Sequence, residues 1–239
     1  MSDRKAPFLN FDIKAQPDDI TCGPTCLHSI YQYYHDEIQL KQVVSEVKSL
    51  KSGGTLAVML GNHALQRGYK AKIYTYNLNV FDPSWFALPQ TKMISNLKKQ
   101  MRYKFRRKKL QVASRAYIKF LEAGGIIQQT ELDEHLLKKY LKQSTPILTG
   151  LSATYLYGTQ REIPATNKYD SIKGEPVGHF VIINGYEEAT NIVYMADPMN
   201  PNPLKSQYYS VTFNRLINSI MLGIVTYDAN LLVIEPKSI

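Results

Sequence analysis

The residues with the clearest capacity for chemistry lie near the N-terminus, in the stretch Gln16 to Pro24 (QPDDITCGP). Apolar residues recur with a helical period through residues 25–34, which predicts a helix that starts beside Cys22. Pro24 suits the first turn of that helix, where no backbone N–H is required. Unpaired N–H groups and the positive end of the helix dipole stabilise a thiolate there. Cys22 is therefore the predicted nucleophile, and Gln16 is a neutral amide donor for an oxyanion.

A thiolate nucleophile needs a base, and His179 is the predicted one. It opens a strongly apolar strand over residues 178–186, and residues 192–196 return as a second strand that ends at Asp197. If the turn is centred near Ala189, Asp197 lies opposite residue 181, within reach of side chains on the same face as His179. A carboxylate there accepts the imidazole N–H that faces away from the thiol.

Each of these residues also has an ordinary structural interpretation. A sheet-edge histidine and a turn-forming Asp-Pro are both common, so the joint occurrence of Gln16, Cys22, His179 and Asp197 carries the hypothesis. The other four histidines fall in helical segments and are expected to be structural or exposed. They are His28, His35, His63 and His135.

The second cysteine, Cys26, is expected to be a small buried packing residue. Four residues apart on one helix, the two cysteines are poorly placed for a disulfide, and two thiols without a second ligand pair do not make a zinc site. We therefore expect no metal and no cofactor. The N-terminus lacks an apolar segment of signal-peptide length, and no apolar run is long enough to span a membrane. These features favour a cytoplasmic protein.

The positive charge of the chain is a local feature. The net charge is +9, but eight of the 29 basic residues lie between Lys98 and Lys109 (KKQMRYKFRRKK). Outside this run, 21 basic residues face 20 acidic ones. A solvated helix face explains such a run most simply, and a site for an anionic partner, either nucleic acid or an acidic membrane surface, is the alternative. Nucleic acid is the less favoured anion because the sequence contains no nucleic-acid-binding motif.

The order of elements predicts an α+β protein. Helices come first, with the nucleophile at a helix start, and they are expected to pack on a later, C-terminal antiparallel sheet. A helical region over Met93–Leu121 suggests that residues 81–125 form an insertion or lid within a single domain, 1–239. Residues 152–177, with scattered Gly, Pro, Thr and Tyr, are expected to form a loop over the site.

In its candidate site residues the sequence resembles papain-like cysteine peptidases of the C39-like branch. This branch includes the domain that removes double-glycine leader peptides from bacteriocin precursors. The matching segments are Gln16 with Asp18–Pro24 (DDITCGP), Gly178–Ile182 (GHFVI) and Ala196–Pro198 (ADP). The resemblance implies a papain-like fold. It also implies Cys22 as nucleophile, His179 as general base and acid, Asp197 as its orienting carboxylate, and Gln16 with the Cys22 backbone N–H as the oxyanion hole. The region from Phe81 to Val177 carries no resemblance.

Three classes of function are consistent with these residues. The first is a thiol hydrolase that cleaves a peptide or amide bond through a thioester, or its close variant, an acyltransferase in which an amine resolves the thioester. The second is a catalytically inactive papain-fold module that binds an anionic partner through Lys98–Lys109. The presence of all four site residues argues against an inactive module. A thiol-based metal or redox site is the weakest, because few ligands lie near Cys22.

Overall fold

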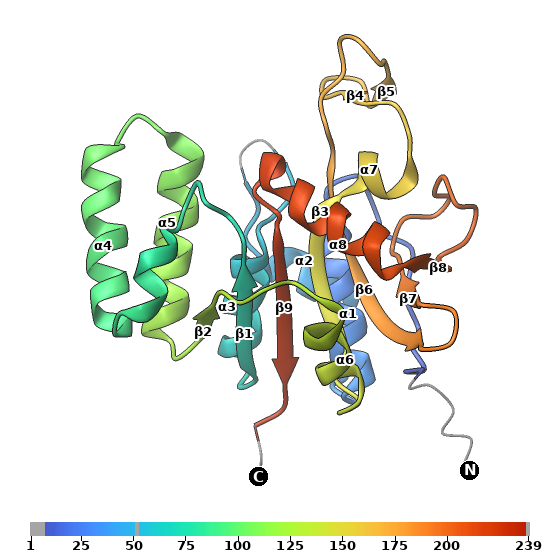
Figure 1. Ribbon diagram of the computed structural model, residues 1–239, viewed down its shortest axis with the longest axis horizontal. Coiled ribbons are helices and arrows are strands. Elements are labelled where there is room, and N and C mark those ends of the chain that lie inside the picture. Colours follow the sequence, from blue (N-terminus) through green and yellow to red (C-terminus); the bar gives the residue numbers. More distant parts are fainter. Residues whose placement is uncertain (1–7, 51–52, 238–239) are drawn as a thin grey trace.

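A mixed sheet forms the centre of the protein. The computed structural model describes residues 8–50 and 53–237. Within them one sheet contains β1 (Lys70–Thr75), β2 (Ile126–Gln128), β3 (Ile147–Ser152), β6 (Gly178–Glu187), β7 (Ile192–Ala196), β8 (Tyr208–Thr212) and β9 (Asn230–Glu235). The strand order is β2-β1-β9-β3-β6-β7-β8 (Figure 1). All neighbours pair antiparallel except β1 and β2, which are parallel.

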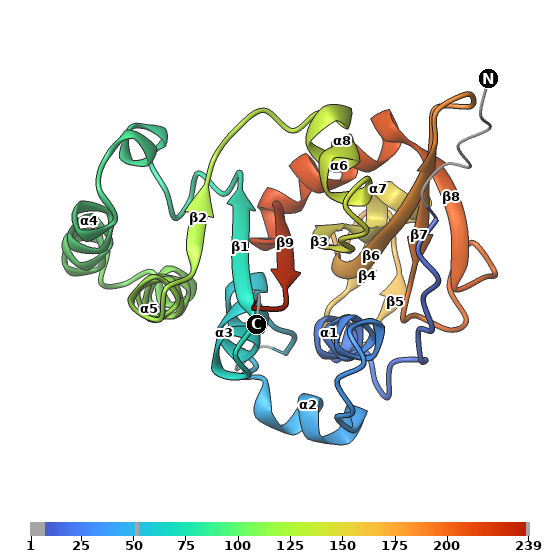
Figure 2. The same ribbon diagram turned by 90° about the horizontal axis from the view of Figure 1, so that it is seen from below.

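The N-terminal helices cover one face of this sheet. They are α1 (Cys22–Tyr33), α2 (Leu40–Glu46) and α3 (Ala57–Gln66) (Figure 2). Helix α1 packs on β6, and α3 packs on β1 and β9. The apolar stripe of α1 faces inward as its spacing predicts, with Leu27 and Ile30 fully buried.

Two later helices cover the opposite face. Helices α6 (Glu134–Leu141) and α8 (Phe213–Leu222) lie on the side of the sheet away from α1 (Figure 2). The side chain of Asp133 caps α6 by accepting a hydrogen bond from the backbone N–H of Leu136 (2.8 Å). Strand β6 is therefore enclosed on both faces, which explains why its sequence is almost continuously apolar rather than alternating.

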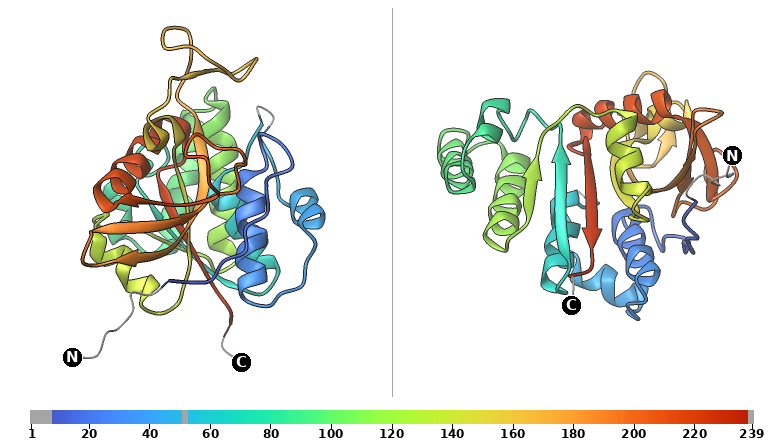
Figure 3. Two further views of the ribbon diagram at one scale, coloured as in Figure 1. Left: turned by 90° about the vertical axis from the view of Figure 1, so that its right-hand side faces the viewer. Right: turned by 60° about the horizontal axis from the view of Figure 1, so that its bottom comes forward.

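The helical region predicted over residues 93–121 is a pair of antiparallel helices. Helix α4 (Gln90–Tyr103) and helix α5 (Lys108–Glu122) lie side by side at one edge of the molecule, joined by a turn over residues 104–107 (Figures 1 and 3). A 3-10 turn, η1 (Pro83–Ala87), leads into them. Helix α5 packs against α3, where the ring of Phe120 lies over Gly61 and Gly125. We call these two helices and their turn the helical hairpin.

The segment expected to be a loop, residues 152–177, has structure of its own. It contains the short helix α7 (Ala153–Tyr157) and a small two-stranded hairpin, β4 (Glu162–Ile163) with β5 (Lys168–Tyr169). The hairpin rises above the sheet at the upper edge of Figure 1.

The predicted α+β, papain-like arrangement is confirmed, with Cys22 at the start of a helix that packs on the sheet. The sheet differs from the expected one in the part of the chain that supplies its strands and in the direction of one strand pair. Its strands β1 and β2 come from the middle of the chain and contribute the parallel pair, so the sheet is neither wholly C-terminal nor wholly antiparallel.

We infer that the chain folds as one domain, with residues 81–125 inserted into it and sharing its core. Met93, Leu97, Leu110 and Phe120 of the helical hairpin belong to the same continuous apolar core as the sheet. Phe120→Ala should therefore lower the free energy of unfolding of the whole protein by about 3–5 kcal/mol in one cooperative urea transition. Phe105→Ala, at a 65% exposed position of the same hairpin, should change it by less than about 0.5 kcal/mol. A separate early transition in Phe120→Ala would contradict a shared core.

Candidate active site

Cys22 is the first residue of α1, as the sequence predicts. Thr21 is the helix N-cap, and its carbonyl accepts hydrogen bonds from the backbone N–H (3.0 Å) and the hydroxyl (2.8 Å) of Thr25. Cys22 is 8% exposed. Cys22 thus lies at the N-terminal end of the helix, where the positive end of the helix dipole stabilises a thiolate.

Gly23 is required by packing of α1. A Cβ atom at this position would lie 2.6 Å from the Thr55 Cγ2 atom and 3.2 Å from side-chain carbons of Leu60 and Phe180. The first turn of α1 therefore approaches α3 and β6 closely because residue 23 has no side chain. This close approach sets the position of Cys22 over the start of β6.

His179 and Asp197 meet across the β6–β7 hairpin. His179 Nε2 lies 2.8 Å from Asp197 Oδ1, and both side chains are buried. Near the turn Glu187 pairs with Ile192, but a bulge between Ile183 and Gly185 shifts the register by one residue. Beyond the bulge Ile182 pairs with Ala196. In this register residue 181 lies opposite residue 197, as predicted.

The environment of His179 favours its protonated form. Burial by itself lowers the pKa of the imidazole, but the Asp197 carboxylate and the Cys22 side chain outweigh burial and raise the pKa of His179 to about 10. Because Nε2 binds Asp197, Nδ1 is the ring nitrogen available to Cys22. The arrangement can therefore hold an imidazolium between a carboxylate and a thiolate.

Asp197 is the most highly hydrogen-bonded side chain of the site. Its Oδ1 atom accepts from His179 and from the backbone N–H of Met199 (2.9 Å). Its Oδ2 atom accepts from the hydroxyls of Tyr157 (2.6 Å) and Tyr209 (2.7 Å). Burial would raise the pKa of this carboxyl, but His179 and these donors hold the pKa of Asp197 below its ordinary value.

Tyr157 and Tyr209 are site residues that the sequence analysis missed. Tyr157 ends α7, and Tyr209 lies on β8, an edge strand that was not predicted. Burial raises the pKa of both phenols, so both remain hydrogen-bond donors at neutral pH. The run Tyr208–Thr212 has the aromatic and β-branched composition of a strand and could have revealed β8. No sequence signal identified the contact with Asp197.

Gln16 lies beside the Asp197–Pro198 segment. Its backbone N–H donates to the carbonyl of Pro198 (2.8 Å), which ties the loop before α1 to the end of β7. Its side-chain Nε2 donates to the carbonyl of Asp18 (2.8 Å). The Oε1 atom is buried and has no hydrogen-bond partner among the described residues. The loop is thus positioned at the site, while the amide donor is engaged locally.

A cleft of about 470 Å³ leads to His179. Asp19 lies on one of its walls, and the other walls come from α7, from the β4–β5 hairpin and from the loop after β7. Asn167 of the β4–β5 hairpin donates a hydrogen bond to Oδ2 of Asp19 (2.7 Å). Asp19 lies three residues before Cys22 in the sequence. The hairpin therefore reaches across the cleft, which agrees with the expectation that residues 152–177 lie over the site.

Lys109 connects this cleft to the helical hairpin. Lys109 lines the cleft, and its ammonium group donates to the carbonyl of Thr226 (3.0 Å), in the 3-10 turn η2 (Gly223–Thr226). Asp228, which follows this turn, is buried, and burial raises the pKa of its carboxyl to about 7. A Cβ atom at Gly178 would clash with this carboxyl, so packing requires the glycine before His179.

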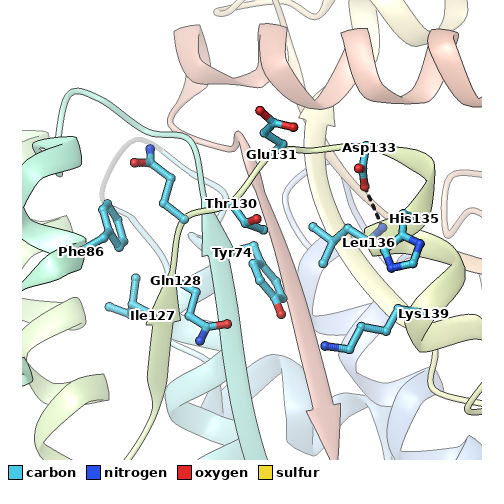
Figure 4. Close-up of a pocket in the computed structure, with 11 residues that line it drawn as sticks. Tyr74, Phe86, Ile127, Gln128, Thr130, Glu131, Asp133, His135, Leu136 and Lys139 are labelled. Carbon is cyan, nitrogen blue, oxygen red and sulfur yellow. Dashed lines mark hydrogen bonds between the residues drawn. The ribbon is translucent and has the colours of Figure 1, made fainter.

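The remaining candidate histidines lie apart from Cys22. His28 is buried in α1, and His63 is buried between the Tyr31 hydroxyl (2.8 Å) and Glu46 (2.9 Å). His35 is exposed. His135 lines a larger groove of about 590 Å³, together with Tyr74 and Lys139 (Figure 4). Neither Cys22 nor His179 lines that groove.

Cys26 lies one turn beyond Cys22 and is fully buried, as expected of a packing residue. Its thiol donates to the carbonyl of Phe180 (3.3 Å), and burial raises its pKa well above the ordinary value. In residues 8–50 and 53–237, no group of three His, Cys, Asp or Glu side chains is placed to hold a metal ion. No helix in this part of the chain is long and apolar enough to cross a membrane.

Comparison with known proteins identifies the family. The model of the Peptidase_C39 like family matches residues 8–219. The chain belongs to this family. This membership confirms the predicted class, a C39-like cysteine peptidase and hence a hydrolase. The matched region contains Gln16, Cys22, His179 and Asp197.

Two solved structures align with nearly the whole chain. One is a double glycine motif protease from an AMS/PCAT transporter in complex with its leader peptide. It has 14% identity and a TM-score of 0.45, and the alignment covers 96% of this chain and 94% of that one. The other is the peptidase domain of Streptococcus ComA, a bi-functional ABC transporter, with 13% identity, a TM-score of 0.45, and coverage of 95% and 100%. No curated protein sequence matches the chain.

The raised pKa of His179 makes a direct prediction for its protonation state. At about pH 8, above the ordinary histidine range, both ring nitrogens of His179 should still carry protons. Long-range proton–nitrogen NMR of the imidazoles measures this for each histidine. His28, whose pKa is lowered by burial, is the internal reference for a neutral ring. Neutral-imidazole shifts for His179 at that pH would contradict the assigned electrostatics.

The same shift fixes the sign of a pH effect on stability. Because the pKa of folded His179 is above the unfolded value near 6.5, its stabilisation is complete below about pH 6.5 and is lost as the pH rises towards about 10. The free energy of unfolding should therefore fall over this interval. In His179→Asn the fall should be smaller.

Proposed function

We propose that this protein is a cysteine hydrolase that cleaves a peptide bond through a Cys22–His179–Asp197 mechanism. The observation that carries the proposal is the His179 imidazole, bound through Nε2 to a buried, ionised Asp197 and adjacent to Cys22 at a helix start. Tyr157, Tyr209 and the Met199 backbone N–H support the same carboxylate. These interactions fix the ring orientation and its tautomer before substrate arrives.

The chemistry follows from this arrangement. The Cys22 thiolate attacks the carbonyl carbon of the scissile bond, and the tetrahedral intermediate collapses to a thioester as His179 protonates the leaving amine. His179 then removes a proton from water, which attacks the thioester and releases the acid product together with the Cys22 thiolate. The buried Asp197 stabilises the imidazolium at each stage, because it remains ionised.

Gln16 and the Cys22 backbone N–H form the proposed oxyanion hole. The anchoring of Gln16 to Pro198 supports this role, since it holds the glutamine loop beside the site. To donate to an oxyanion, the Gln16 amide must release the Asp18 carbonyl and turn its Nε2 group toward the substrate. The rotation exchanges a local hydrogen bond to Asp18 for one made in the transition state, where it contributes to catalysis.

The charge of the cleft favours a cationic peptide. Three carboxylates line it, those of Asp19, Glu162 and Glu175, although burial raises the pKa of Glu162 and so weakens its negative charge. Lys109 also lines the cleft and keeps its positive charge, but its ammonium group is directed to the Thr226 carbonyl and lies 4.8 Å from the centroid of the Tyr227 ring. A peptide with lysine or arginine near the scissile bond would therefore gain favourable electrostatic interactions.

A library of peptides with mass-spectrometric detection of new N-termini tests the proposed function. The wild-type protein should cleave a subset of the library, and Cys22→Ala should cleave none. Cys26→Ala is the matched control on the same helix and should retain cleavage. Turnover by Cys22→Ala equal to that of the wild type would refute the mechanism.

Two further variants resolve the supporting roles. Gln16→Ala should reduce kcat about 100- to 1,000-fold, with a small change in KM, as for the loss of one oxyanion donor. Asp197→Asn should leave a weak residual activity, roughly 10⁴-fold below wild type, because the tautomer of His179 is no longer fixed. An unchanged kcat in Gln16→Ala would exclude Gln16 from the oxyanion hole.

Acyl transfer is the second candidate, because the same residues form the same thioester. Addition of a primary amine to a cleaved peptide separates the two reactions. A hydrolase should yield the free acid as its main product, and amine should not raise the rate of acyl-enzyme breakdown. Predominant formation of the amide at low amine concentration would favour a transferase.

A further inference from the structure

The tip of the helical hairpin combines dense positive charge with exposed aromatic rings. The tip consists of the turn between α4 and α5 and the residues that flank it, 102–108 (RYKFRRK). All seven side chains are exposed, and Tyr103 and Phe105 are 87% and 65% exposed. No aspartate or glutamate occurs between Asp82 and Glu122, so the whole hairpin carries a single sign of charge up to its last helical residue.

This composition does not serve the stability of the fold. Arg107 and Lys108 lie at the N-terminus of α5, where positive charge opposes the helix dipole, and no side chain of a described residue caps that helix. Lys104 donates to a neutral partner, Gln100 (2.7 Å). The exposed rings of Tyr103 and Phe105 leave apolar area in water. A surface that is unfavourable for the isolated protein indicates a partner that compensates for it.

Hydrogen bonds from the Gln111 side chain hold the backbone of the tip in place. The Gln111 side-chain amide donates to the carbonyl of Met101 (2.9 Å) and to that of Lys104 (3.2 Å), across the turn. Leu110 anchors the start of α5 in the core. The tip is thus a fixed, convex projection from which aromatic and basic side chains extend together.

From these observations we propose that the tip docks on an anionic phospholipid bilayer. Lysine and arginine gain energy near anionic headgroups, and aromatic rings partition into the adjacent interfacial layer. A convex tip with two aromatic rings among basic residues fits this boundary, where the apolar and charged parts are both satisfied. Nucleic acid is the less favoured occupant, because the sequence contains no nucleic-acid-binding motif.

Docking at the tip would orient the cleft. The turn between α4 and α5 lies at the same end of the molecule as the β4–β5 hairpin that covers the cleft, as two perpendicular views show (Figures 1 and 3). Lys109, directly after the tip, lines the cleft and contacts η2. The bilayer would therefore face the entrance of the proposed active site.

Flotation of the protein (residues 1–239) with vesicles tests this inference. Vesicles of phosphatidylcholine alone and of phosphatidylcholine with phosphatidylglycerol in equal parts are compared at low and raised salt. Binding is expected to the anionic vesicles, weaker at raised salt, and not to the neutral ones. Cys22→Ala should bind as well as wild type, so the result is independent of the proposed catalysis.

Two sets of variants separate charge from aromatic insertion. The triple variant Arg106→Gln, Arg107→Gln, Lys108→Gln should bind roughly 100-fold more weakly, about five-fold for each charge removed. Lys41→Gln, Lys70→Gln, Lys142→Gln removes the same charge at exposed positions elsewhere and should retain most of the affinity. Tyr103→Ser with Phe105→Ser keeps the charge and should bind about tenfold more weakly.

Three results would overturn the proposal. They are an absence of binding to anionic vesicles at low salt, equal binding to neutral vesicles, and equal losses in the tip and control triples. A fluorescent single-stranded oligonucleotide is the competing probe. If it binds through the tip more tightly than the anionic vesicles and displaces the protein from them, the tip is a nucleic-acid surface instead. The substituted side chains are exposed, and circular dichroism verifies that each variant folds.

Discussion

The site depends on one buried charge, the carboxylate of Asp197. A carboxylate removed from water is stable only if hydrogen bonds and an opposite charge replace its hydration. Here four donors converge on its two oxygens, from His179, Met199, Tyr157 and Tyr209. Removal of a partner from such a buried pair costs about 3–5 kcal/mol. The same interactions that make the burial tolerable also hold His179 in one orientation and charge state.

The fold can be understood as the means of bringing those donors together. Strands β6 and β7 place His179 and Asp197 on one face, and the bulge near Gly185 corrects their register. Helix α7 and the edge strand β8 bring the two tyrosines from opposite directions along the chain. Helix α1 approaches β6 closely because Gly23 has no side chain, and Cys22 at the start of this helix is among the groups that act on His179. The β4–β5 hairpin and the Asp19 loop line the cleft, and we propose that they determine which substrate binds.

The sequence predicts those parts of this arrangement that follow from local patterns. The helix that starts at Cys22, the apolar strand after Gly178 and the turn before Asp197 all have clear periodicity or composition. Counting from the turn also predicts the His179–Asp197 pairing, but the predicted register holds only beyond the bulge between Ile183 and Gly185, which no sequence pattern indicated. Tyr157 and Tyr209 were not predictable, because their contacts with Asp197 join separate elements across 40 and 12 residues. The break at residues 104–107 was also missed, since helix-forming lysine and arginine continue through it and the turn is held by the tertiary contacts of Gln111.

The most direct test of the central claim is the rate of alkylation of Cys22 by iodoacetamide, measured peptide by peptide by mass spectrometry at about pH 6, well below the ordinary thiol range. If a protonated His179 stabilises the thiolate, Cys22 should react readily at this pH, and His179→Ala should react far more slowly. Cys26 is fully buried and should stay unreactive in both proteins, which verifies that the core is intact. Equal Cys22 rates in the two proteins, with Cys26 still protected, would contradict the thiolate–imidazolium pair on which the account rests.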